Sequence, residues 1–150
     1  RIEPPADTWV GLDEDAVCAL CHDESSVGAQ TIGDMRQALD QLSTDLSAAD
    51  AILTTAERAG MLVDDGRAAW LEAREQQVQS RVLVHTFAAA PFTEAATAGI
   101  HSAGLAHDAG EAALEELQFR RRGLAIATLL ILAFLVTLGL KIRRLPGDFR

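Results

Sequence analysis

The sequence predicts an all-α protein that consists of a small helical bundle and one C-terminal transmembrane helix. Three observations lead to this fold class. Apolar residues recur at helical spacing between residues 31 and 119, no run with the period of a β-strand has convincing length, and one uncharged run near the C-terminus matches a bilayer in length. The 150 residues suffice for about one domain with a modest core.

Residues 1–30 form the first predicted segment. They contain Pro4, Pro5, Gly11 and Gly28 and show no sustained apolar period. We therefore expect an irregular segment that wraps around the group bound by its two cysteines.

The first predicted helix covers residues 31–60. Thr31 and Asp34 form a start similar to a capping box, and Gly60 marks the end. Steps of four and three residues place one unbroken apolar stripe on this helix, which we expect to be buried. The stripe consists of Met35, Leu39, Leu42, Leu46, Ala49, Leu53 and Ala56.

Two further helices complete the predicted bundle of residues 31–119. The second is expected over residues 64–88, before Pro91, and the third begins near Thr93 and can run on directly into the membrane helix. Each carries a stripe that needs a partner for burial. The second stripe consists of Ala68, Leu71, Glu75, Val78, Val82 and His85, and the third of Ala96, Ile100, Ala103, His107, Gly110, Leu114 and Leu117.

Residues 120–145 are predicted to form the transmembrane helix with its basic flanks. The run from Gly123 to Leu140 has no charge and spans about 27 Å as a helix, which is close to the thickness of the hydrocarbon layer. Basic residues border it on both sides, at 120–122 and at 141, 143 and 144. The alternative is a buried core helix. Residues 146–150 would form a cytoplasmic tail.

The charge distribution argues against nucleic acid as a partner. Residues 1–119 carry 6 basic and 21 acidic side chains, a net charge of −15, and Lys141 is the only lysine in the chain. Binding to nucleic acid depends on clustered basic side chains, which this acidic body lacks.

The segment Cys18-Ala19-Leu20-Cys21-His22 is a CxxCH motif, the signature of covalent haem c attachment. Two thiols at this spacing reach the vinyl groups on one edge of a porphyrin, and the following histidine becomes an axial ligand of the iron. Two alternatives are a Cys18–Cys21 disulfide or redox pair and a structural zinc site. The first lacks a thioredoxin-like βαβ pattern, and the second lacks another cysteine pair.

The sixth ligand of the iron has several candidates in the sequence. His85 and His107 lie on the apolar stripes of their helices, so both are predicted to point inward as metal ligands. His101 lies about 100° off its stripe and is expected to be solvated or turned toward a neighbour. Met35 belongs to the first stripe and is expected to fill the core, and Met61 lies in a turn.

The motif and the helices at 31–60 and 64–88 resemble the C-terminal part of the multihaem c-type cytochromes. The resemblance covers about residues 16–110 and rests on Cys18, Cys21 and His22, with Val84-His85-Thr86-Phe87 standing where that family supplies a histidine ligand. It implies haem c as cofactor and electron transfer as function. The family has several haem motifs and this chain has one, which argues against reductase activity.

The predicted function is that of a membrane-anchored c-type cytochrome, an electron-transfer protein rather than an enzyme. Its partners would be the lipid bilayer and a redox protein or electron-transfer complex of a respiratory or photosynthetic membrane. Because haem c is attached on the exported side, we expect residues 1–119 in the periplasm. Export requires a signal, so we expect either a processed chain or a sequence that begins partway along a longer polypeptide. The alternative is a non-catalytic single-pass subunit of a larger membrane assembly.

Overall fold

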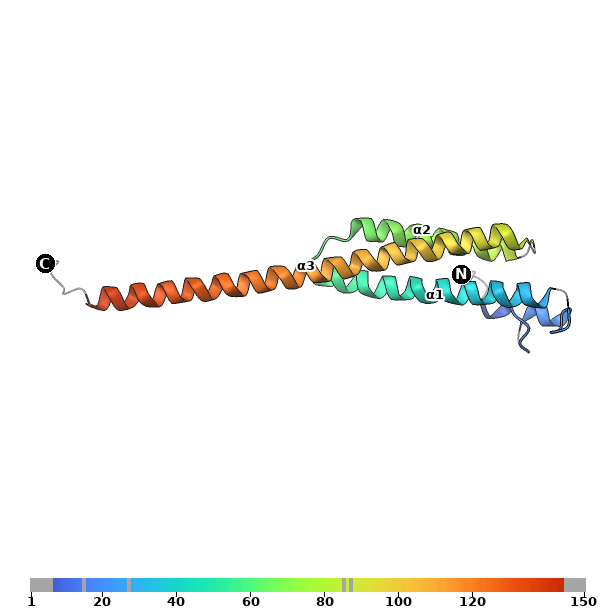
Figure 1. Ribbon diagram of the computed structural model, residues 1–150, viewed down its shortest axis with the longest axis horizontal. Helices are drawn as coiled ribbons and strands as arrows, with labels where there is room; N and C mark the ends of the chain where they lie inside the picture. The colour runs from blue at the N-terminus through green and yellow to red at the C-terminus, as the bar shows by residue number, and fades with distance from the viewer. Residues whose placement is uncertain (1–6, 15, 27, 85, 87, 145–150) are drawn as a thin grey trace, which may run out of the picture. The chain divides into compact units, whose positions relative to one another are not determined.

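The computed structural model describes residues 7–14, 16–26, 28–84, 86 and 88–144. Within them lie the 3-10 helices η1 (Asp7–Trp9) and η2 (Val17–Leu20), followed by the α-helices α1 (Ala29–Arg58), α2 (Asp64–Val84) and α3 (Ala89–Arg144) (Figure 1). These described residues contain no β-strand, so the predicted all-α class is confirmed.

Helix α1 follows the sequence pattern closely. It begins at Ala29, two residues before the predicted start, and ends at Arg58, and Gly60 takes the left-handed conformation (φ 82°) that commonly ends helices. All seven residues of the predicted stripe are buried, together with Ile32. The stripe was therefore a correct prediction of the face that α1 turns toward the core.

Helix α2 begins at the predicted Asp64 and ends at Val84, but its predicted inner face is wrong. Leu71, Val78 and Val82 are 62%, 56% and 61% exposed. The buried residues of α2 are instead Gly66, Ala73, Gln77, Ser80 and Val84. Most of these side chains are small, and small side chains let three helices approach closely, whereas the bulkier apolar residues of α2 face solvent.

Helix α3 begins at Ala89, four residues before the predicted start. Pro91 lies in its first turn, where a missing backbone N–H removes no hydrogen bond within the helix, so the proline does not break it. The helix continues without interruption to Arg144, as the sequence allowed. The N-terminal part of α3 buries a wide face, because both α1 and α2 pack against this part of the helix.

The core of the bundle consists of two apolar clusters to which all three helices contribute. Met35 and Leu39 pack with Val84, Phe92 and Ala96 in the first. The second is formed by Leu42, Leu46, Ala73 and Ala103. The helix crossings leave no room for larger side chains. A Cβ atom on Gly66 would lie 2.6 Å from Leu53 Cδ2, and one on Gly110 would lie 2.7 Å from Ile52 Cγ2.

Polar contacts join α2 to α1 at the rim of this core. Arg67 donates hydrogen bonds to both carboxylate oxygens of Glu57 and also bonds Asp50 and Thr54. These bonds lower the pKa of Glu57 and raise that of Arg67. Trp70 donates to the carbonyl of Leu46 at 3.1 Å, and the guanidinium groups of Arg67 and Arg74 lie 5.9 and 5.4 Å from the centre of its ring.

The chain divides into two compact units, Arg1–Ala113 and Leu114–Arg150, and the division falls within α3. The second unit contains an 18-residue window with a mean hydropathy of 2.5, and none of this window is buried. A core helix of a soluble protein would bury such a run, so that alternative is wrong. Among the described residues, α3 is the one helix long and apolar enough to span a bilayer.

Candidate functional site

The CxxCH motif forms one helical turn that precedes α1 and is separated from it by residues 23–28. The carbonyl oxygen of Cys18 accepts hydrogen bonds from the backbone N–H groups of Cys21, at 3.2 Å, and of His22, at 3.0 Å. Cys18 is half-buried, Cys21 is exposed, and both are free thiols. The two thiols and the imidazole therefore arise from a single turn, and no disulfide occupies either sulfur.

The turn is held against the bundle by contacts of the chain before it. Ala16 is buried, and the guanidinium Nη1 of Arg36, two turns into α1, donates a 3.1 Å hydrogen bond to the carbonyl of Val10. Val10 itself packs against the first core cluster. The contact between Arg36 and Val10 could not be predicted from sequence patterns, because the two residues are 26 positions apart and belong to no shared motif.

A second contact, an ion pair, joins η1 to the end of α2. The guanidinium of Arg81 donates two hydrogen bonds to the carboxylate of Asp7, at 2.7 and 2.8 Å, across 74 positions of sequence. The pair is largely shielded, with side chains 24% and 12% exposed, and the bonds to Asp7 raise the pKa of Arg81. The N-terminal segment therefore lies at the end of the bundle where α1 begins and α2 ends.

The segment around the motif has almost no core of its own. Neither η1 nor η2 contains a buried residue. Trp9, Val17 and Leu20 are 53%, 55% and 82% exposed. Val17 and Leu20 flank Cys18 and Cys21 in sequence, so apolar surface next to the two thiols stays open to an apolar group that could cover it.

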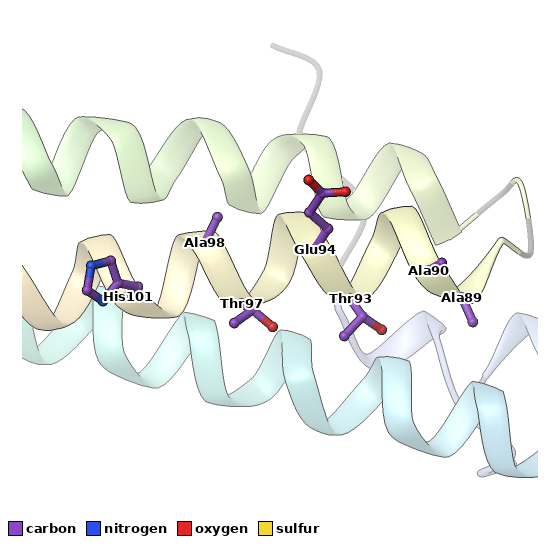
Figure 2. Close-up of a pocket in the computed structure, with 7 residues that line it drawn as sticks. All are labelled: Ala89, Ala90, Thr93, Glu94, Thr97, Ala98 and His101. Atoms are coloured by element: carbon purple, nitrogen blue, oxygen red, sulfur yellow. The ribbon is translucent and has the colours of Figure 1, made fainter.

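Beside the start of α1, two hollows lie on the same end of the bundle. A groove of about 300 Å³ between α1 and α3 is lined by Thr31, Asp34, Met35, Phe92 and other residues of these helices. A wider and more open hollow lies on α3, and Figure 2 shows that Glu94 and His101 lie well apart along this helix. All of its lining residues come from α3, so no second element encloses it. The two ionisable groups do not converge there on a shared site.

Of the two histidines predicted as distal ligands, His85 lies outside the described residues. The residue before it, Val84, is buried beside Met35 and Phe92, at the same end of the bundle as the CxxCH turn. His107 is half-buried beside Asp45 of α1. About 24 Å of helix separates Asp45 from the start of α1, so the structure does not bring His107 to the CxxCH turn.

The other ligand candidates lie in three different environments. Met35 is 3% exposed and belongs to the first core cluster, as expected for a core side chain. Met61 follows α1, about 45 Å along that helix from the CxxCH end. His101 is exposed, as its position off the stripe predicted.

His107 takes part in a different cluster. Its ring, Asp108 and Glu111 offer one ligand atom each, and these atoms lie within 4.8 Å of one another. Both carboxylates are exposed, and His107 is half-buried. The arrangement is compatible with weak cation binding at the surface.

Comparison with known protein families, with characterised proteins and with solved structures finds no match to this chain.

Proposed function

We propose that this chain is a membrane-anchored c-type cytochrome that transfers electrons to or from a respiratory or photosynthetic membrane complex. The observation that carries the proposal is the CxxCH motif, whose two free thiols and histidine come from a single turn. The resemblance of the motif and its helices to multihaem c-type cytochromes supports the same function.

The cofactor would be held by three side chains of the turn. The thiols of Cys18 and Cys21 would form thioether bonds, and His22 would be the proximal axial ligand. When bound, haem c supplies an iron that accepts and donates one electron. The exposed Trp9, Val17 and Leu20 would shield the ring edge from water, which favours rapid outer-sphere transfer over substrate binding.

For the distal position we propose His85. It directly follows Val84, whose buried place beside Met35 brings the end of α2 to the end of the bundle that carries the motif. Two histidine ligands leave no open coordination position, which fits a carrier of electrons better than a reductase. His85→Ala should convert a low-spin spectrum to a high-spin one and allow carbon monoxide to bind the reduced iron, whereas His101→Ala should change neither.

The membrane segment would anchor the carrier with its N-terminal unit on the exported side, where haem c is attached. The fully exposed apolar window of α3 supports the anchor. Thr128 and Thr137 donate their hydroxyl hydrogens to the carbonyls of Leu124 and Phe134, so neither hydroxyl would be unsatisfied in lipid. Protease added to spheroplasts should digest the N-terminal unit and leave the C-terminal end protected.

A haem stain tests the proposal directly. The chain is produced in a host with cytochrome c assembly machinery, separated on a denaturing gel and stained for peroxidase activity. The wild-type band should retain colour, and the Cys18→Ala/Cys21→Ala variant should lose it. A colourless wild-type band would contradict the proposal and favour the alternative of a non-catalytic single-pass subunit.

A further inference from the structure

The outward face of α2 carries a regular apolar stripe that no described part of the chain covers. We call this face the outer stripe, and it consists of Ala68, Leu71, Glu75, Val78 and Val82. All five residues are exposed, and its three large apolar side chains are each more than half exposed. Such a surface on a helix of a folded bundle is typical of an interaction site.

The spacing of the outer stripe specifies the shape of its occupant. The residues follow one another at steps of three and four, which is the heptad pattern of a coiled-coil seam. A seam of this kind accepts the apolar face of a second α-helix, with knobs of one helix inserting between residues of the other. The occupant is therefore a helix rather than a strand or an extended peptide.

The charges along the stripe disfavour a second copy of this chain. In a parallel, in-register pair, the two Glu75 carboxylates would face each other across the seam, where like charges destabilise. In an antiparallel pair with Glu75 opposite Val78, each Glu75 carboxylate would be buried in the seam against an apolar side chain. Both orientations therefore place Glu75 where no basic side chain lies directly opposite it.

We propose that the outer stripe docks an amphipathic helix of a partner protein that carries a basic side chain opposite Glu75. The net charge of −15 on residues 1–119 adds to this preference for a basic partner. The apolar residues of the stripe supply the buried seam, and Glu75 selects the partner by charge. The docking site does not depend on haem attachment.

Two synthetic helical peptides of about three heptads provide the test. Both have leucine at the seam positions, and they differ at the position facing Glu75, which is lysine in one and glutamate in the other. Binding to the full-length chain in detergent micelles is followed by fluorescence anisotropy. We expect the lysine peptide to bind at least about tenfold more tightly, and the Glu75→Lys variant to invert that preference.

A charge within the stripe should abolish binding, whereas a matched charge elsewhere should not. Val78→Asp should weaken the binding of the lysine peptide by about tenfold or more. Leu105→Asp alters a half-exposed leucine on α3 and should leave the binding of this peptide unchanged. Circular dichroism checks that both variants fold. Equal binding of the two peptides, no binding of either, or a wild-type dimer that Val78→Asp dissociates would each overturn the proposal.

Discussion

Helices α1 and α2 each carry one regular apolar stripe in the sequence, and the structure buries one and exposes the other. On α1 every stripe residue is buried, and Leu39, Leu42 and Leu53 are completely inaccessible. On α2 the stripe faces solvent, and the core contacts come from Gly66, Ala73 and Ser80. An apolar stripe thus does not by itself determine which face of a helix enters the core of the bundle.

The largest expected effect is on the free energy of unfolding, when one stripe leucine is replaced by alanine on each helix. Leu42→Ala should lower the free energy of unfolding by about 2–5 kcal/mol, because it removes a fully buried side chain from the second core cluster. Leu71→Ala should cost less than about 0.5 kcal/mol, because the side chain is 62% exposed. Thermal or denaturant unfolding of the two variants measures the difference, and similar losses would contradict the assignment of the faces.

A second pair of variants tests the close crossing that the small residues permit. Gly110→Ala should destabilise the bundle by about 1–3 kcal/mol, since its Cβ would lie 2.7 Å from Ile52 Cγ2 and 3.4 Å from the Ile52 backbone. Gly104→Ala, on the same helix with open space around it, should stabilise by about 0.5–1 kcal/mol. Unfolding curves that move in the same direction would show that α3 is not packed against α1 as described.

Two arginine–aspartate pairs differ in what they join, because Arg81–Asp7 links α2 to η1, whereas Arg36–Asp40 lies within α1. Asp7→Asn removes a shielded partner of Arg81 on α2, and we expect faster amide hydrogen exchange over residues 16–22 and a loss of about 1 kcal/mol. Asp40→Asn removes the exposed partner of Arg36 on α1 and should cost only about 0.3–0.5 kcal/mol. Equal exchange rates at Cys18–His22 in the two variants would exclude Asp7 as the residue that positions the motif.

The smallest expected effect is on the stability of the fold at acidic pH. Arg67 lowers the pKa of Glu57 below its usual 4.5, so this carboxylate stabilises the folded state above that pH. The contribution is lost as the pH falls through the lowered pKa of the folded protein. Arg67→Gln should therefore weaken the dependence of stability on pH below about 4.5, and unfolding midpoints of variant and wild type should converge there. Parallel curves over this range would exclude the pair as a pH-dependent contact.

Local sequence signals predicted much of this fold. The start of α2 at Asp64, the buried face of α1 and the continuous run of α3 followed from caps and periodicity, because each depends on nearby residues. The inner face of α2 did not, because the burial of Gly66 and Ala73 depends on residues of α1 and α3 that are distant in sequence. The CxxCH motif was evident, whereas the contacts that hold it, Arg36 to Val10 and Arg81 to Asp7, link residues that share no pattern.

Covalent attachment of haem at Cys18 and Cys21 is the central claim, and the mass of the intact chain tests it most directly. The protein is matured in a host with cytochrome c assembly machinery and measured under denaturing conditions by mass spectrometry. The account predicts the mass of the chain plus one haem, and the mass of the chain alone for Cys18→Ala/Cys21→Ala. A wild-type chain found only at its own polypeptide mass would contradict the account.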